Sequence, residues 1–187
     1  YGIIGDSDSS DGDNTEPSRG GRDYWLLKVD GNGNKLWDHR YGGPDADLCR
    51  CAIQTADGGF LLAGASWSGI GGDKSESSRG YWDYWAVKVD SNGTKQWDRR
   101  YGGSAEDEPA AAIQTADGGY LLVGFSRSGA SGDKSEPGKG LEDYWVVKLD
   151  SNGTKQWDRR FGGTEAEFAT TAIEGSAGSF LLAGYSY

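Results

Sequence analysis

The chain has 187 residues, of which 35% are hydrophobic, and it is rich in glycine (32 residues) and in aromatic residues (12%). This combination indicates many short strands joined by turns, and the aromatic content argues against a disordered chain. The formal net charge of -10, with no basic stripe in the sequence, disfavours nucleic acid as a partner, and no apolar run has the length of a transmembrane helix.

The first predicted strand covers residues 1–5. Its sequence, Tyr-Gly-Ile-Ile-Gly, matches Tyr-Leu-Leu-Val-Gly at 120–124 and Phe-Leu-Leu-Ala-Gly at 180–184. Since the chain begins with tyrosine and contains no methionine, we expect it to be a processed or excised piece.

The sequence then repeats with a spacing of 60 residues. The tripeptide Asp-Tyr-Trp occurs at 23–25, 83–85 and 143–145, and six of the eight tryptophans keep this spacing. A fixed period of this kind is the signature of a repeat architecture. We therefore expect one repeat domain over residues 1–187, with partial units at both ends. The expected units are 1–49, 50–109, 110–169 and 170–187.

Each full unit is predicted to contain four strands, A to D. In the third unit, alternation and turn residues place them at 110–115, 120–126, 144–150 and 155–161. Asp-Gly at 117–118 joins A to B and Asn-Gly at 152–153 joins C to D, because both dipeptides tolerate the positive φ of a tight hairpin. A long glycine-rich loop at 128–142 joins B to C.

The order of the strands can also be predicted. Strand A carries small side chains, which suits the crowded axis of a propeller, and the charged strand D suits an exposed outer edge. The predicted fold is all-β: a β-propeller-type array of four-stranded antiparallel blades, about three repeats long. Because a propeller needs roughly four blades or more, the chain belongs to a larger ring, associates with other copies, or closes by pairing its own ends.

The composite pattern is Asp-Tyr-Trp-x-x-Lys-x-Asp-x-Asn-Gly, then Tyr-Gly-Gly, then Ala-Ile-Gln-Thr-Ala-Asp-Gly-Gly-Tyr-Leu-Leu, and it covers nearly the whole chain. It resembles the β-propeller-like repeats of secreted and cell-surface proteins of Bacteroidota and of some archaea. The resemblance implies an extracellular, cell-surface or periplasmic location and an adhesive, scaffolding or ligand-binding role. It implies no defined activity.

Two cysteines and one histidine bear on catalysis. Cys49 and Cys51 would lie on one face of a regular strand, where a disulfide between them would be strained. We expect them instead to be small buried residues without a disulfide. His39 stands where the other units have Arg99 and Arg159, which indicates a basic position on the outer strand. No nucleophile–histidine pair is therefore expected, and the chain is predicted not to be an enzyme.

The loop between strands B and C has the residues best suited to a metal site. Gly-Asp-Lys-Ser-Glu occurs at 72–76 and 132–136, and Gly-Asp-Asn-Thr-Glu at 12–16. Carboxylates in such a loop suit Ca²⁺, but hydrogen bonds within the loop or recent duplication would also keep the copies alike. The acidic run at 106–108 is expected in a solvated loop. The candidate metal ligands are Asp13, Glu16, Asp73, Glu76, Asp133 and Glu136.

Two tryptophans break the period and are the candidate ligand-binding residues. Trp67 and Trp82 flank the same long loop, and the next unit has Arg127 and Glu142 in their places. Aromatic rings at one rim of a blade can stack on a sugar, contact another protein or pack locally.

The sequence is compatible with three functions. We favour a non-enzymatic extracellular interaction or scaffold module, whose partners are other protein chains or copies of itself that complete the ring. The second is a carbohydrate-binding propeller, with or without calcium, whose partners are glycans. The third is a sialidase-like or other glycoside hydrolase, for which the many carboxylates provide candidate residues.

Overall fold

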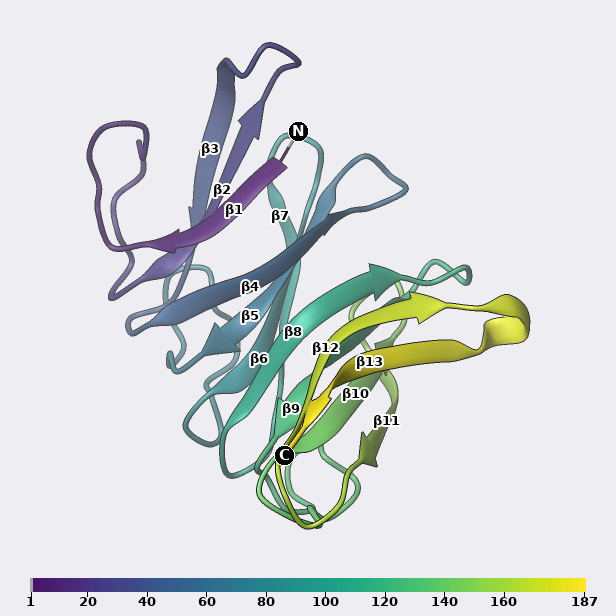
Figure 1. Ribbon diagram of the computed structural model, residues 1–187. Coiled ribbons are helices and arrows are strands. Elements are labelled where there is room, and N and C mark those ends of the chain that lie inside the picture. Colours follow the sequence, from purple (N-terminus) through teal and green to yellow (C-terminus); the bar gives the residue numbers. More distant parts are fainter. Residues whose placement is uncertain (1) are drawn as a thin grey trace.

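The computed structural model describes residues 2–187, which form thirteen β-strands, a short 3-10 helix η1 (Ser176–Gly178) and no α-helix (Figure 1). Tyr1, the first residue of the predicted first strand, lies outside the described residues. Over the described range, no helix has the length and apolar character needed to span a membrane. The strands are β1 (Gly2–Ser7), β2 (Asp23–Val29), β3 (Lys35–Tyr41), β4 (Asp47–Gln54), β5 (Phe60–Ser66), β6 (Asp83–Val89), β7 (Lys95–Tyr101), β8 (Asp107–Gln114), β9 (Tyr120–Ser126), β10 (Asp143–Leu149), β11 (Lys155–Phe161), β12 (Glu167–Glu174) and β13 (Phe180–Ser186).

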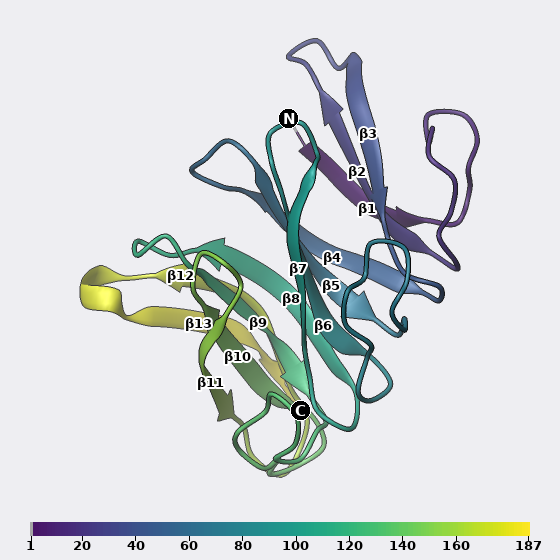
Figure 2. The ribbon, with the colours of Figure 1, turned by 180° about the vertical axis from the view of Figure 1, so that it is seen from behind.

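The strands form four antiparallel sheets with their strands in chain order. We call them sheet one (β1–β3), sheet two (β4–β7), sheet three (β8–β11) and sheet four (β12–β13). Figures 1 and 2 show them in series, with the N-terminus on the first sheet and the C-terminus on the last. The prediction of an all-β fold with four-stranded antiparallel units is confirmed, while the sheets of residues 2–187 do not close into a ring.

The predicted Asn-Gly hairpins join β2 to β3, β6 to β7 and β10 to β11. In sheet two, Gly93 has a φ of 84°, which an L side chain rarely adopts. The Asp90 carboxylate accepts hydrogen bonds from the N–H groups of Asn92 at 2.8 Å and Thr94 at 2.9 Å. Residues within the turn therefore favour its conformation, which explains why the sequence reveals it.

The Asp-Tyr-Trp motif joins successive sheets. In β6, Trp85 packs into the core shared with sheet one, and Tyr84 packs into the core shared with sheet three. The Tyr84 hydroxyl donates to the Trp145 carbonyl oxygen at 3.0 Å, and their ring centroids lie 4.8 Å apart. Tyr24 makes the same contacts with Trp85. Because side chains alternate along a strand, the adjacent tyrosine and tryptophan serve opposite junctions.

A β-bulge separates the two cysteines. Cys49 pairs with Gly64 and Cys51 with Ala63, so the register shifts by one residue between them. Cys49 packs toward sheet one and Cys51 toward sheet three. The expectation that they share one face is therefore wrong, because the extra residue restarts the alternation. Both are free thiols, and burial raises the pKa of Cys51 to about 12, so it is not a ready nucleophile.

The charged fourth strand lies at the sheet edge, as predicted, but its aspartate is buried. Asp98 in β7 is 3% exposed and accepts hydrogen bonds from Trp85 Nε1 at 3.1 Å and from the Ser75 N–H at 2.8 Å. Asp158 accepts from Trp145 Nε1 in the same way. The prediction of a solvated charged edge is wrong for these aspartates, because a buried indole N–H requires an acceptor.

Candidate functional site

The long loops after β5 and β9 hold neighbouring sheets together. The N–H of Asp73 donates to the carbonyl oxygen of Gly42 in the preceding unit at 2.8 Å. Asp133 makes the same bond to Gly102 at 2.9 Å. The backbone of each loop is therefore hydrogen-bonded to the preceding unit. This contact gives the repeated loop sequence a structural reason.

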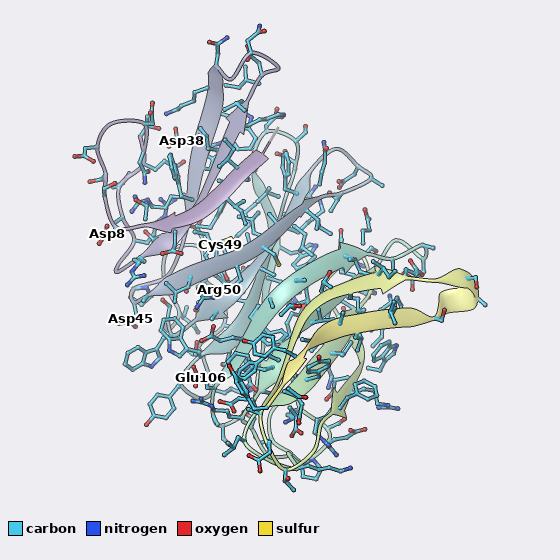
Figure 3. All side chains as sticks on the ribbon, in the orientation of Figure 1. Asp8, Asp38, Asp45, Cys49, Arg50 and Glu106 are labelled. Carbon is cyan, nitrogen blue, oxygen red and sulfur yellow. The ribbon has the colours of Figure 1, made fainter. Side chains whose placement is uncertain are left out.

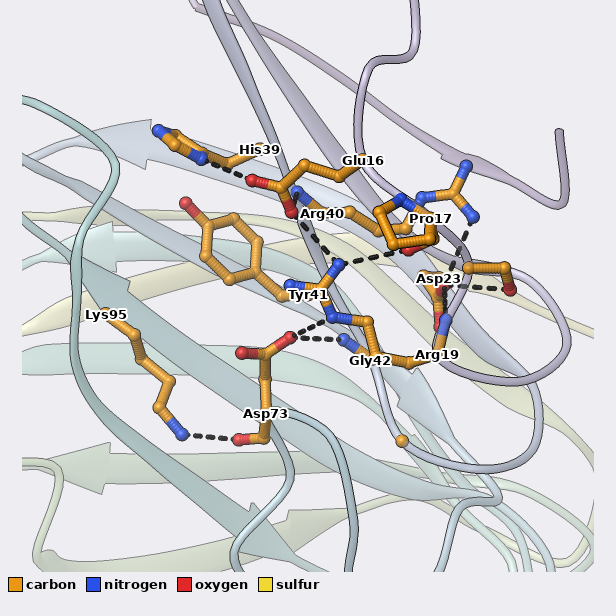
Figure 4. Close-up of polar contacts among 12 residues, drawn as sticks. Glu16, Pro17, Arg19, Asp23, His39, Arg40, Tyr41, Gly42, Asp73 and Lys95 are labelled. Atoms are coloured by element: carbon orange, nitrogen blue, oxygen red, sulfur yellow. Dashed lines mark hydrogen bonds and ion pairs between the residues drawn. The ribbon is translucent and has the colours of Figure 1, made fainter. Parts of the chain in front are cut away.

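The aspartate side chains of these loops are paired with arginine. Figure 4 shows Asp73 between the Arg19 Nε atom, at 3.0 Å, and the Gly42 N–H, which donates at 3.3 Å. Burial raises the pKa of Asp73, and the charge of Arg19 opposes this effect. Asp133 lies 3.1 Å from Arg100 in the next junction.

The glutamate at the end of each loop motif binds the fourth strand of its own sheet. Glu76 accepts the backbone N–H of Arg100 at 2.9 Å, and Glu16 accepts that of Arg40 at 3.1 Å. Glu16 also lies 2.8 Å from His39 Nδ1 (Figure 4). Burial alone would raise the pKa of Glu16, but the hydrogen bonds with His39 and the Arg40 backbone lower it.

The six predicted metal ligands are therefore not gathered into a metal site. Among residues 2–187, no group of three or more His, Cys, Asp or Glu side chains is placed to hold a metal ion. Asp13 is exposed, and Glu136 accepts the backbone N–H of Arg160 at 3.3 Å. A calcium ion needs several free oxygen ligands, and here N–H groups and arginines engage the oxygens of five of the six carboxylates.

We expect calcium to leave the thermal stability unchanged. Millimolar calcium chloride, followed by excess chelator, should shift Tm by less than about 1 °C, since a ligand that does not bind the folded state does not stabilise it. Scanning calorimetry measures this. A calcium-dependent rise in Tm that Asp73→Asn removes, and that the exposed control Asp45→Asn retains, would contradict the assignment.

A second group of ionisable side chains lies inside the sheet junctions. Asp47, Asp83 and Lys74 are almost completely buried. Burial raises the pKa of Asp83 to about 6 and lowers that of Lys74 to about 8. Shifts of this kind are common in active sites. A substrate cannot reach these buried groups, however, so we assign them to the packing of the sheets.

The acidic run at 106–108 also belongs in part to this interior. Asp107 is the first residue of β8 and is fully buried. It accepts hydrogen bonds from the Gly103 N–H at 2.7 Å and from the Ser128 hydroxyl at 2.9 Å. The expectation of a solvated loop is therefore wrong at Asp107, because its carboxylate caps backbone and hydroxyl donors from two other segments.

The two non-periodic tryptophans lie together at the end of sheet two. Trp67 follows β5, Trp82 precedes β6, and their ring centroids are 6.1 Å apart. Trp67 is 54% exposed, and the neighbouring Tyr81 is 66% exposed. Tyr81 was not among the predicted ligand-binding residues. The same signal would have identified it, because the next unit has Leu141 in its place.

A hollow of about 370 Å³ opens beside these rings, at the loop end of sheets two and three. Arg127 Nε donates to Glu142 at 2.7 Å, and another guanidinium nitrogen contacts Glu106. Burial raises the pKa of Glu106, while the charge of Arg127 opposes this effect. Figure 3 places Glu106 near the beginning of β8. The lining residues are Tyr81, Trp82, Ala105, Glu106 and Arg127.

The single histidine serves a sheet junction. His39 lies in β3, with Nδ1 2.8 Å from Glu16 and Nε2 3.0 Å from the carbonyl oxygen of Asn92 in the hairpin of sheet two. It therefore links sheet one to sheet two.

The chain matches no protein-family model and no curated protein. Its function is therefore inferred from the geometry of the structure.

Proposed function

We propose that the chain is a non-enzymatic interaction module of the β-propeller type, which joins further strands of the same repeat at its two open ends. The proposal rests on the exposure, at both ends, of residues that are buried at the internal junctions. Leu181 in β13 is 64% exposed, whereas its counterparts Leu61 and Leu121 are fully buried. Phe161 is 51% exposed, whereas its counterpart Tyr101 is 3% exposed.

Sheet one exposes the other half of the same junction. Trp25 in β2 is partly exposed, whereas its counterparts Trp85 and Trp145 are fully buried against the preceding sheet. Ile3 is 50% exposed, whereas Leu62, which has the same place in the register of sheet two, is fully buried. Burial of one such large apolar side chain contributes roughly 1.5–3 kcal/mol.

A second copy of the chain is the partner that fits both ends. Sheet four consists of β12 and β13, which correspond to the first two strands of sheets two and three. The hairpin β2–β3 of another copy has the sequence of the third and fourth strands. Pairing β13 with that hairpin, in place of the copy's own β1, completes a four-stranded sheet.

This pairing covers the exposed residues of β2, β11 and β13, while Ile3 leaves the junction with β1 and Leu182 takes its place in the register. The face of the added hairpin that carries Trp25 would pack on sheet three, where Phe161 is uncovered. Leu181 would take the place of Gly2 against sheet two of the other copy. Gly2 pairs with Lys28, and Leu121, the counterpart of Leu181, pairs with the equivalent lysine Lys148. Since the two contacting surfaces differ, association is head-to-tail and builds rings or open chains. The extracellular location is a further part of this proposal and rests on the resemblance of the repeats.

Sedimentation velocity over a range of concentrations tests the assembly. We expect concentration-dependent dimers and larger species, and Leu181→Glu should weaken association at least about tenfold, which is about 1.4 kcal/mol. Leu141→Glu is a matched control, because Leu141 is also exposed, at 63%, but lies in a loop. A chain that stays monomeric at all concentrations, or a Leu181→Glu variant that associates like the wild type, would refute the proposal.

A further inference from the structure

We infer that the hollow beside Tyr81 and Trp82 binds a neutral sugar ring, with the aromatic side chains as stacking surface and the Arg127 cluster as hydrogen-bonding edge. The site lies at the loop end of sheets two and three. The assembly proposed above uses the open faces of sheets one, three and four. The inference therefore goes beyond the proposed function and does not depend on it.

The fold does not require the aromatic residues at this site. Sheet three has Arg127 and Glu142 where sheet two has Trp67 and Trp82. Its second and third strands nevertheless pair in the same register as those of sheet two. Because the repeat provides this internal comparison, packing alone does not account for three aromatic residues clustered at one rim. Exposed aromatic clusters of this kind mark binding surfaces.

The charges around the hollow select a neutral ligand. Arg127 is flanked by Glu106 and Glu142, so the three side chains together carry one net negative charge when ionised. The carboxylates and the overall charge of -10 disfavour an anion. The guanidinium group at the wall disfavours a quaternary ammonium group, which aromatic clusters can otherwise bind.

The polar side chains of the hollow are suited to hydrogen bonding with the hydroxyl groups of a sugar. The side chain of Arg127 is 51% exposed and that of Glu106 is 24% exposed, so the edge offers both donors and acceptors to a ligand. An aromatic face carries negative charge density, which attracts the weakly positive C–H groups on one face of a pyranose ring. A volume of about 370 Å³ suits one or two sugar rings better than a folded partner, which needs a flat interface of roughly 800 Å².

Isothermal titration calorimetry and saturation-transfer NMR test the inference. The probes are neutral oligosaccharides of glucose, mannose, galactose, xylose and N-acetylglucosamine. We expect binding of at least one of them, and Trp82→Ala should weaken it about tenfold or more. Leu141→Ala is the matched control, because Leu141 stands at the position of Tyr81 in the next unit and is similarly exposed. The Leu141→Ala variant should bind the sugar with the affinity of the wild type.

A double variant separates loss of binding from loss of folding. Trp67→Arg with Trp82→Glu copies the pair Arg127–Glu142, which sheet three already accommodates. We expect an unchanged circular dichroism spectrum and no detectable sugar binding. The inference would be overturned if none of the sugar probes bound, or if the double variant bound sugar with full affinity. It would also be overturned if the hollow bound only peptides selected from a displayed library. Leu181→Glu should bind sugar normally, so a failure here and a failure of the assembly proposal are distinguishable.

Discussion

Replacing Gly124 by alanine should destabilise the chain by about 3 kcal/mol or prevent its folding. Gly124 lies in β9, and a Cβ atom there would approach the carbonyl oxygen of Glu108 to 2.0 Å and the Cα atom of Pro109 to 2.6 Å. It would also lie 2.7 Å from the Tyr84 hydroxyl. The first two atoms are backbone, so they cannot move without breaking the pairing of β8 with β9. The third belongs to the bond that joins sheet two to sheet three.

Gly5→Ala is the matched control. Gly5 has the same place in the register of sheet one, opposite Trp25, that Gly124 has opposite Trp145. No atom lies within 4 Å of a Cβ built there. Its stability should therefore stay within about 0.5 kcal/mol of the wild type. Urea unfolding followed by circular dichroism measures the free energy of unfolding of both variants. An equal decrease in both would contradict the prediction, because it would show that the close approach at Gly124 is not the cause.

The positions of the strands follow from local sequence, and most were predicted well. Strands β9 (Tyr120–Ser126) and β11 (Lys155–Phe161) have the predicted bounds, and β10 (Asp143–Leu149) differs by one residue. Alternation and turn chemistry are properties of neighbouring residues, so a single sequence contains them. The sheets of residues 2–187 do not close into a ring, so the propeller stays a prediction.

Contacts between distant segments could not be predicted in this way. Strand β8 begins three residues before the predicted strand, at Asp107, whose hydrogen-bond partners are 4 and 21 residues away in the chain. The bulge that turns Cys49 and Cys51 to opposite faces has no strong local signal. Asp98 appears in the sequence as part of a charged run. Only the packing of Trp85 against sheet one makes it a buried acceptor.

The candidate site was predicted in part for the same reason. Broken periodicity identified Trp67 and Trp82, and the structure brings their rings together. The repeated carboxylates suggested a cation because their arginine partners come from other parts of the fold. Arg19, for example, lies 54 residues from Asp73 in the chain but contacts it across a sheet junction. Repetition indicates a constraint, and the partners decide whether that constraint is a ligand or a neighbouring sheet.

Ionisation of Asp83 should lower the stability of the chain between about pH 4 and pH 6. Burial raises the pKa of this carboxyl from 3.8 to about 6, although the Arg79 N–H opposes the effect, and the charge of Asp107 raises the pKa further. Well below pH 3.8 the carboxyl is protonated in both states and contributes no difference. As the pH rises, the unfolded chain loses the proton first, so ionisation favours unfolding until the folded state also ionises. A shift of about two pH units corresponds to about 3 kcal/mol.

The variant Asp83→Asn isolates this contribution from that of carboxyls such as Asp57, whose pKa is lowered to about 2 and whose effect on stability has the opposite sign. An asparagine Oδ1 atom can still accept the Arg79 N–H, which donates to Asp83 at 2.5 Å. We therefore expect the two proteins to be equally stable near pH 3. The variant should gain about 3 kcal/mol over the wild type by pH 7. Urea unfolding at each pH measures the difference. A difference that is flat across this range, or that grows toward acid, would mean that Arg100 and Lys74 stabilise the ionised carboxyl in the folded state.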